Sequence, residues 1–553
     1  MRQVTKLAGV TTTVLLDAGV VSRCRRRVHL EHDPGMRDTE RGAPDPTAEL
    51  RKADAAAHRR AVADRLSAHF GADWTEVPPG RSGEREAATV AALAEGRPLI
   101  WGAQLPRDTE HGRRGAIDLL VRTRGGYVPV LVVRHKVHDP GQGARTSPLF
   151  GVTDVGGAND PARKVRPQPR DQLRLAHTRA LLRAAGYADE RTGHAGVIGL
   201  DGDTVVWHDL TAPTWPGSRT ALAEYETRFA DRVAVAQAAA TGGEPLARPS
   251  RIVECKSCPW WPVCDAQLVA ERDVSLVVRG EDAALLRTAG VETVDALAGI
   301  DPEDRDNPPL VGMPLGDAVG LAKAWLADLT LVRRHREVSV PRADVELDVD
   351  MESFGDAGAY LWGTLLSGAD TGIAQGYRAF VSWDPLPTDD EARSFAEFWS
   401  WLGAVRAAAA ERGLSFRAYC YNELAENRWL LASARRFTGR PGIPTRRQVQ
   451  QFIASDEWFD LFGSVRDHFL CSHGKGLKTI APVAGFQWRD PEAGGENSMR
   501  WYRDAVGLDG GEPDLAQRVR LLEYNEDDVR ATAVLRAWMS SDEVAGIPFV
   551  GDI

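Results

Sequence analysis

Cysteine is scarce in this sequence, with six residues in a chain of 553. That number is too small for the disulfide framework of a small secreted scaffold. The sequence also lacks an apolar run of the ~20 residues needed to span a bilayer. The apolar stretch Thr11–Val21 is interrupted by Asp17 and is not followed by a small-residue cleavage site, so we find no signal peptide. These absences predict a soluble, cytoplasmic protein without a membrane partner.

An excess of positive charge is missing as well, because 68 Lys and Arg stand against 78 Asp and Glu, a net charge of -10. The whole chain therefore exerts no general attraction on nucleic acid, and phosphate binding requires local basic patches. Two short patches exist, Ser22–His29 and Arg122–Gly126. Solvated surface is the alternative interpretation of each. No repeat of fixed period is visible, which argues against a solenoid or a propeller.

The chain length predicts several domains, and composition and pattern separate three regions. We expect an α/β domain over residues 1–270, a small helical module over 271–335, and a second α/β domain over 340–553. In the first, Gly115–Thr123 and Tyr127–Val137 are typical of paired strands around an Arg-Gly-Gly turn, and Asp171–Gly186 is typical of a helix. In the second, two short helical patterns flank Ala289-Gly290-Val291. This predicts either a helix-hairpin-helix unit that binds backbone phosphates or a helical linker.

The third region has the pattern of an α/β layer arrangement, with strands that precede and follow a long helix. The helix is expected over Asp390–Arg412. The strands are expected over Ala343–Gly355, Ala359–Leu366, Tyr377–Trp383 and Ser415–Tyr421. The remainder is mostly helical in pattern.

The first of these strands carries alternating acidic residues. The period of two places Val345, Leu347, Val349 and Met351 on one face and Glu346, Asp348, Asp350 and Glu352 on the other. Apolar strands follow it, so we expect it to lie inside the sheet. Buried carboxylates need cations, and hard oxygen ligands suit Mg²⁺ or Mn²⁺.

More polar residues of the same kind follow along the chain. Asn422 and Glu426 come just after a predicted strand. Tyr524 and Asp528 are four residues apart in a predicted helix, which places them on one helical face.

This series resembles the tyrosine-bearing subclass of the DEDD exonucleases, which have an RNase H-like fold. The resemblance implies two bound Mg²⁺ or Mn²⁺ ions and 3′-to-5′ hydrolysis of single strands. It implies Asp350 and Glu352 as the first motif, Glu426 as the second and Asp528 as the third, with Tyr524 orienting the attacking water. Glu426 departs from the family, where aspartate is usual. Gly474–Trp488 resembles the segment between the second and third motifs, and Lys478 within it is a candidate phosphate contact.

Three of the cysteines are closely spaced, Cys255, Cys258 and Cys264, and they do not complete a four-ligand site. Cys420 and Cys471 have apolar contexts typical of buried residues. Cys24 lies among arginines, and one early cysteine with a distant C-x2-C-x5-C resembles the iron–sulfur RecB-like nucleases. The resemblance implies one [4Fe–4S] cluster, held by Cys24, Cys255, Cys258 and Cys264, that clasps the first domain. Zinc or no metal are the alternatives.

The same resemblance implies a PD-(D/E)xK-type site between the cysteines, on a restriction-endonuclease-like fold. His58, Asp118, Lys136 and Gln172 match parts of that pattern. Arg134 stands where an acid belongs, and a cation there repels Mg²⁺. We therefore expect the working site in the third region rather than in the first.

Together these patterns predict a metal-dependent nuclease that acts on nucleic acid, DNA rather than RNA. A non-enzymatic nucleic-acid-binding scaffold is the alternative, supported by Glu426 and Arg134. An assembly factor with a redox-sensing cluster is a third interpretation.

Overall fold

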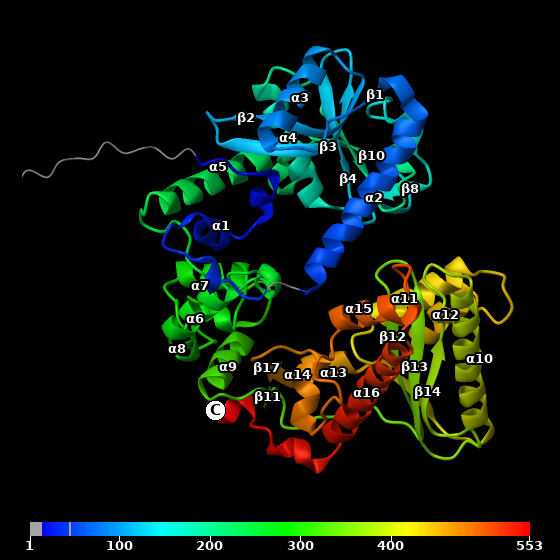
Figure 1. Cartoon of the computed structure of the whole chain (residues 1–553). Coiled ribbons are helices and arrows are strands. Elements are labelled where there is room, and N and C mark those ends of the chain that lie inside the picture. The colour runs from blue at the N-terminus through cyan, green and yellow to red at the C-terminus, as the bar shows by residue number, and fades with distance from the viewer. Residues whose placement is uncertain (1–13, 44–45) are drawn as a thin grey trace, which may run out of the picture. The chain divides into compact units, whose positions relative to one another are not determined.

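The computed structural model describes residues 14–43 and 46–553, and the chain divides into two compact units, Met1–Leu268 and Val269–Ile553 (Figure 1). The division lies near the predicted boundary at residue 270. Residues 271–335 belong to the second unit, so a separate middle domain stays a prediction. Among the described helices, none has the length and apolar character needed to cross a membrane. Thr11–Thr13 of the apolar N-terminal stretch lie outside the described residues, and the 3₁₀ helix Ala18–Ser22 forms its end.

Unit 1 is built on an eight-stranded sheet in the order β1-β2-β3-β4-β9-β10-β6-β7. The strands are β1 Trp74–Glu76, β2 Leu99–Asp108, β3 Arg113–Arg122, β4 Tyr127–Val132, β6 Ala144–Pro148, β7 Ala158–Asp160, β9 His194–Ile198 and β10 Thr204–Asp209. The predicted hairpin is confirmed, because β3 and β4 pair antiparallel. Gly126 in its turn has a φ of 147°, and an added Cβ would meet the Tyr187 carbonyl oxygen at 2.6 Å. A glycine is therefore required there.

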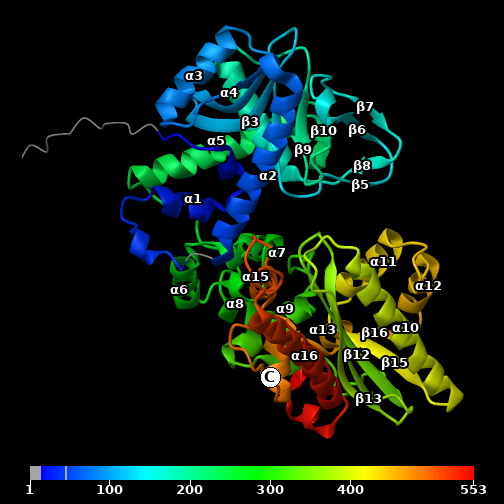
Figure 2. The same ribbon diagram turned by 45° about the vertical axis from the view of Figure 1, so that its right-hand side comes forward.

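Helices cover both faces of this sheet (Figure 2). Leu120 and Leu131 pack in one core with α4 (Pro169–Ala184) and α5 (Ala221–Ala240), whereas Leu119 and Val130 pack in another with α2 (Pro46–Phe70). The remaining strands and α-helices of unit 1 are α1 Arg25–His32, α3 Ser82–Ala94, β5 His138–Pro140 and β8 Arg163–Val165, and α6 Trp261–Glu271 extends across the boundary between the units. The alternation of strand side chains between two helical layers defines an α/β unit.

Unit 2 begins with three helices, α7 Glu281–Thr288, α8 Val294–Ala298 and α9 Leu315–Leu326. The two short helices predicted around Ala289-Gly290-Val291 are thus confirmed as α7 and α8. The strands β11 Leu331–Arg333 and β17 Phe469–Cys471 form a separate two-stranded sheet.

The main sheet of unit 2 has five strands in the order β14-β13-β12-β15-β16. They are β12 Val345–Ser353, β13 Ala359–Gly368, β14 Gly376–Val381, β15 Phe416–Cys420 and β16 Trp458–Asp460. β12 pairs antiparallel with β13 and parallel with β15, so the predicted internal position of the acidic strand is confirmed.

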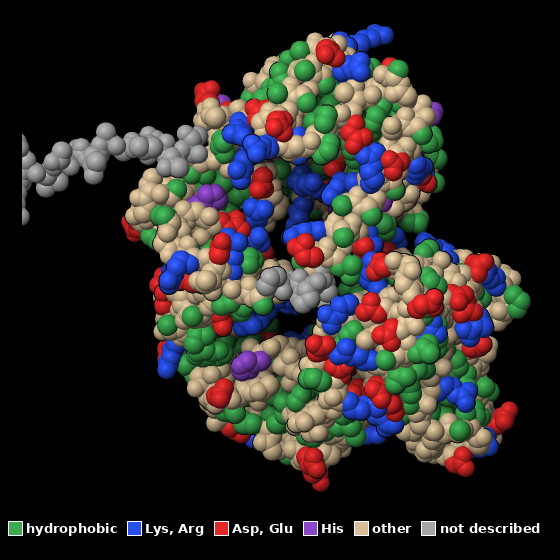
Figure 3. All heavy atoms as spheres, in the orientation of Figure 1, with side chains coloured by type: hydrophobic (Ala, Val, Ile, Leu, Met, Phe, Trp, Pro, Cys, Tyr) green, Lys and Arg blue, Asp and Glu red, His purple; other side chains and the backbone are tan. Residues whose placement is uncertain are grey.

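One face of this sheet carries α10 (Asp390–Glu411), which packs on the apolar residues of β12, and α16 (Leu515–Met539) packs on the other (Figures 1 and 2). The further helices are α11 Leu424–Arg436, α12 Arg446–Ile453, α13 Leu461–His468, α14 Leu477–Ile480 and α15 Gly495–Val506. Figure 3 shows acidic and basic side chains interspersed over the visible face of unit 2, and Lys and Arg side chains beside α2 in unit 1.

Candidate active site

The two faces of β12 divide as the alternation predicts. Val345, Leu347, Val349 and Met351 lie in the apolar core on the α10 side. The four acidic residues of β12 therefore face α16. They fall into two pairs that differ in the cations around them.

Glu346 and Asp348 pair with arginines, although Asp348 Oδ2 has no hydrogen-bond partner and burial raises the pKa of Asp348 to about 6. Arg536 of α16 is buried and pairs with both, with Nη2 3.2 Å from Glu346 Oε2 and Nη1 bonded to Asp348 Oδ1. Arg342 Nε lies 2.6 Å from Glu346 Oε1. Burial opposes the ionisation of Glu346, but the Arg342 hydrogen bond and the Arg536 charge outweigh it and lower the pKa of Glu346 to about 2. This pair belongs to the structural framework.

Asp350 and Glu352 face a third carboxylate, Asp528 of α16. One oxygen of each lies within 4.8 Å of the others, an arrangement that could hold a metal ion. Burial, followed by the charge of Asp528, raises the pKa of Asp350 to about 7. Burial also raises the pKa of Glu352 well above its usual range, and that of Asp528. A divalent cation would offset the repulsion between these buried carboxylates.

Each of these three acids accepts a hydrogen bond from a neutral side chain. Asn525 Nδ2 donates to Asp350 Oδ2 at 2.7 Å. Ser498 Oγ of α15 donates to Glu352 Oε2 at 3.1 Å, and Trp488 Nε1 donates to Asp528 Oδ1 at 2.6 Å. Neutral donors orient Asp350 and Glu352 without cancelling their charge, whereas Asp528 also lies 3.5 Å from the Lys478 ammonium.

The amide of Asn525 is itself oriented. The Tyr377 hydroxyl donates to Asn525 Oδ1 at 2.8 Å, which leaves Nδ2 to face Asp350. Gly363 of β13 stands opposite Asp350 in the register, and a Cβ there would lie 1.6 Å from Asn525 Oδ1. Only glycine leaves room for this amide.

Tyr524 and Lys478 line the same site. Lys478 Nζ of α14 donates to the Tyr524 hydroxyl at 3.0 Å and lies 3.5 Å from Asp528 Oδ1. The ammonium also lies 4.5 Å from the centre of the Tyr524 ring and 5.4 Å from that of Trp488. Burial raises the pKa of Tyr524, so its hydroxyl stays protonated at neutral pH. The predicted shared face of Tyr524 and Asp528 is confirmed, since both are buried on α16 against this site.

Glu426 occupies the first turn of α11 and is not one of the three acids drawn together. It is buried, and its Oε2 has no hydrogen-bond partner. Burial, followed by the charge of Asp350, raises the pKa of Glu426 well above its usual range. A buried carboxylate oxygen without a donor is costly, and a cation would satisfy it. Its role as a ligand stays a prediction.

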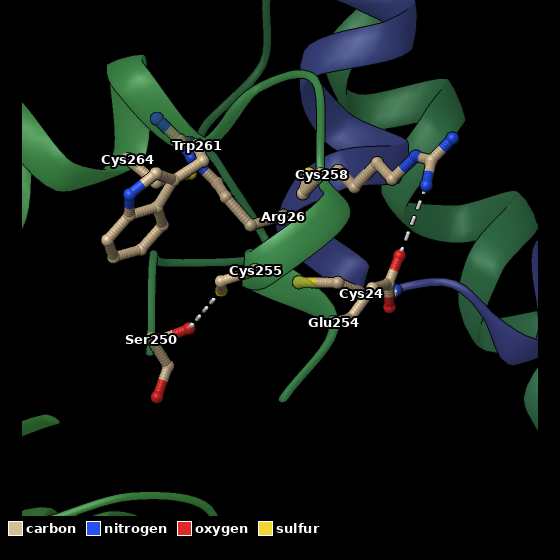
Figure 4. A pocket seen from close by; sticks show the side chains of 9 residues that line it. Cys24, Arg26, Ser250, Glu254, Cys255, Cys258, Trp261 and Cys264 are labelled. Atoms are coloured by element: carbon tan, nitrogen blue, oxygen red, sulfur yellow. Dashed lines mark hydrogen bonds and ion pairs between the residues drawn. The ribbon is translucent and has the colours of Figure 1, made fainter. Parts of the chain in front are cut away.

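The four cysteines named from the sequence line one pocket in unit 1 (Figure 4). No three of the sulfur atoms of Cys24, Cys255, Cys258 and Cys264 lie within 4.8 Å of one another. Thiolates on a single zinc ion would be ~3.8 Å apart for Zn–S bonds of ~2.3 Å. The pocket is therefore not a closed zinc site. Burial raises the pKa of the Cys264 thiol to about 11, and Cys255 and Cys258 shift in the same direction.

The four residues matched to a PD-(D/E)xK-type site lie on separate elements of unit 1, and their joint role stays a prediction. His58 Nε2 lies 3.0 Å from the Gly199 carbonyl oxygen, and Gln172 Oε1 accepts from Trp215 Nε1 at 3.0 Å. Asp118 on β3 accepts from the Val132 amide at 2.8 Å. Lys136 is exposed and follows the end of β4, so the expected place on a strand is wrong.

Arginines pair with the acids near this position. Arg134 Nη2 lies 3.1 Å from Asp54, and Arg59 Nε lies 3.8 Å from Asp118 Oδ1. Burial raises the pKa of Asp118, against the charges of Arg174 and Arg59. Arg134 thus pairs with an acid of unit 1. A catalytic role for this part of the chain stays a prediction.

Three of the side chains at the acidic site were not assigned from the sequence. Trp488 lies in the segment 474–488 that the resemblance singled out, and Asn525 follows Tyr524 directly. For both residues, the neighbouring sequence therefore indicated the site. Ser498 had none, because a single serine in a helical pattern is unremarkable in composition.

Residues 437–540 match the family model of the RNase H superfamily. No curated protein and no solved structure matches the chain. The C-terminal part of the chain is therefore an RNase H-like domain, a fold whose superfamily consists generally of nucleases that cleave phosphodiester bonds. The match includes Lys478, Tyr524 and Asp528, whereas the acidic strand β12 precedes it.

Proposed function

We propose that unit 2 is a metal-dependent nuclease that removes nucleotides from single strands in the 3′-to-5′ direction. One observation carries the proposal, the convergence of Asp350, Glu352 and Asp528 in a buried site next to two carboxylates that pair with a buried arginine. The two carboxylate pairs of β12 therefore differ in role. Arginine completes the structural pair, and the other pair is left for a metal.

The donor set fits Mg²⁺ or Mn²⁺, because it consists of carboxylate oxygens. Asp350, Glu352 and Asp528 would hold the metal, and the unsatisfied Oε2 of Glu426 supports its inclusion as a fourth ligand. When bound, such ions activate water and stabilise the negative charge that develops on the leaving oxygen.

Tyr524 and Lys478 act on the substrate side of the site. The Tyr524 hydroxyl remains protonated beside Asp528 and can orient a water molecule. The Lys478 side chain is 37% exposed, so its ammonium is accessible to a phosphate group. The distance of 3.0 Å between Lys478 Nζ and the Tyr524 hydroxyl places the two groups side by side at the site.

Polarity and substrate are tested with single-stranded DNA and RNA labelled at the 5′ end, in Mn²⁺ or in EDTA. We expect a ladder of progressively shortened DNA in Mn²⁺ only, and no cleavage when the 3′ end is blocked. Cleavage of a 3′-blocked strand would contradict the polarity. No cleavage of either strand would favour the non-enzymatic scaffold.

For unit 1 we propose a [4Fe–4S] cluster held by Cys24, Cys255, Cys258 and Cys264. Its support is the donor set, in which Cys24 joins three thiols of the distant segment 255–264 in one pocket. The thiolates of such a cluster bind different irons, so they need not approach as closely as ligands of one ion. The pocket has a volume of about 10 Å³, which is room for about one water molecule. The cysteine side chains would therefore have to rotate to admit the cluster.

Anaerobic purification tests this second proposal. The wild type should show absorption near 400 nm and contain iron and sulfide in equal amounts, and C24S/C258S should lose all three. A colourless wild type, or stoichiometric zinc, would overturn it. Neither result bears on the nuclease site in unit 2.

A further inference from the structure

A second cavity of unit 1, with a volume of about 400 Å³, is lined by an unusual number of arginines. They are Arg23, Arg25, Arg26, Arg232 and Arg248. Glu254 is the one acid among the lining residues. This local excess of positive charge lies in a chain of net charge -10.

Hydrogen bonds to the backbone hold several of these guanidinium groups in place. Arg232 donates to the Arg23 carbonyl oxygen from Nε at 3.1 Å and from Nη2 at 3.0 Å. Arg26 Nη1 donates to the Ala247 carbonyl oxygen at 3.3 Å. A carbonyl oxygen orients a guanidinium without removing its charge, so these cations remain uncompensated by these contacts.

Acids nearby offset part of the charge. Arg25 Nη2 lies 2.9 Å from Asp231, which also pairs with Arg232. Arg23 lies 3.7 Å from Asp17 and 3.5 Å from Glu31. Asp231 is shared between two arginines, and burial together with the neighbouring Arg25 lowers the pKa of Arg232.

The N-terminus of α1 adds to the positive potential. α1 begins at Arg25, and its N-cap residue Cys24 makes no side-chain hydrogen bond to the first turn. Helix N-termini favour acids, yet this first turn contains none and begins with three consecutive arginines. Positive side chains at the positive end of a helix are unfavourable unless an anion joins them, and the Glu254 carboxylate, which accepts from the Cys24 amide at 2.7 Å, supplies part of that negative charge.

We propose that this arginine cavity binds the phosphate backbone of single-stranded nucleic acid. The guanidinium groups of these five arginines line a space larger than one phosphate group, and their forked donors suit phosphate oxygens. The site is distinct from the acidic site of unit 2 and goes beyond the proposed hydrolysis. It also shares Cys24, Arg26, Ser250 and Glu254 with the cysteine pocket, so the two are adjoining.

The test is equilibrium binding of a fluorescent single strand to the full-length protein in EDTA, measured as anisotropy over a range of salt concentrations. The variant is R25Q/R248Q, at two exposed lining positions. The control is R183Q/R191Q, which removes the same charge from exposed arginines elsewhere in unit 1. Circular dichroism confirms that both variants are folded.

We expect R25Q/R248Q to bind about tenfold more weakly than the control, with a salt slope smaller by about 1.4, as two lost phosphate contacts predict. R25K/R248K should fall between wild type and the Gln variant, because it keeps charge but loses the fork. Equal losses in the Gln variant and the control would overturn the proposal. Displacement of the strand by inorganic phosphate at matched ionic strength would overturn the assignment to a polynucleotide.

Hydrolysis separates this proposal from the nuclease. In Mn²⁺ the control R183Q/R191Q should cleave like wild type, whereas R25Q/R248Q should need about tenfold more strand for half-maximal cleavage. If the wild type never cleaves but still shows the arginine-dependent binding, the nuclease proposal for unit 2 is contradicted and the binding proposal for unit 1 stands.

Discussion

Asn525 Nδ2 donates to Asp350 Oδ2 at 2.7 Å, which ties α16 to the acidic strand at the candidate site. N525D keeps the shape of the side chain but replaces the donor with a second carboxylate beside Asp350. We expect the Mn²⁺ concentration for half-maximal cleavage to rise about 10–100-fold, as outer-shell substitutions typically do. The control is N497D on α15, whose Nδ2 donates to the Glu492 carbonyl oxygen at 2.8 Å. An unchanged Mn²⁺ requirement in N525D would remove Asn525 from this role.

Gly363 makes room for the same amide. In G363A the new Cβ would meet Asn525 Oδ1 at 1.6 Å, so the amide must move away from Asp350. We expect a loss of about 1–3 kcal/mol in stability and a fall in cleavage like that of N525D. G403A on α10 is the control, because nothing lies within 4 Å of its added Cβ. Wild-type behaviour of G363A would show that the amide is not confined.

Proton and metal compete for Asp350. Its pKa is raised to about 7 by burial and by Asp528, whereas an unfolded aspartate has a pKa of about 3.9. Between these values the folded, metal-free protein holds a proton that the unfolded chain has released, so its stability falls as pH rises. D350N lacks this titration and should become more stable than wild type, by about 1 kcal/mol or more, as pH rises from about 4 to about 7.

Thermal unfolding in EDTA at a series of pH values measures this difference. Mn²⁺ should restore the wild type at neutral pH and leave D350N unchanged, because metal binding requires the carboxylate. A difference between wild type and D350N that is independent of pH would contradict the raised pKa.

Substitution of Glu426 tests whether this residue is a fourth metal ligand or a buried structural acid. E426Q preserves the volume and should weaken Mn²⁺ binding about 10–100-fold by calorimetry, with little change in the stability of the metal-free protein. E426D, which restores the family's usual residue, should keep measurable binding. E411Q at the exposed end of α10 serves as the control. Equal Mn²⁺ affinity in E426Q and wild type would exclude Glu426 from the site.

Arg536 belongs to the framework rather than to the chemistry. R536M leaves Glu346 and Asp348 buried without their shared cation, and we expect a loss of about 3–5 kcal/mol in stability. R530M on the same helix removes an exposed pair with Glu526 and should cost about 1 kcal/mol or less. Similar unfolding temperatures for the two variants would contradict the division of β12 into two carboxylate pairs.

The sequence predicted β12 well because its alternation is strict, and one period-two pattern defines both the core face and the acidic face. It also predicted the common face of Tyr524 and Asp528, since helical spacing alone requires it. It could not separate Glu346 and Asp348 from Asp350 and Glu352. The separation depends on Arg536, which is 188 residues from Asp348 along the chain. No local sequence pattern indicates the contact between these two residues.

The same reason explains the missed donors. Trp488 and Ser498 are single polar groups on separate segments, and only the packing of those segments against the sheet brings them to the acids. In unit 1 the sequence grouped Cys24 with the distant cysteines, and the four do line one pocket. The spacing of their sulfur atoms depends on side-chain rotation, which no sequence motif specifies.

The most direct test of the central claim is the rate of phosphodiester cleavage in Mn²⁺ by wild type, D350N/D528N and E523Q, measured on one end-labelled single strand. E523Q changes an exposed acid on the same helix as Asp528. We expect wild type and E523Q to cleave at equal rates and D350N/D528N to be slower by at least about 10³-fold, because the metal site is lost. Equal cleavage by all three proteins would contradict the assignment of the site.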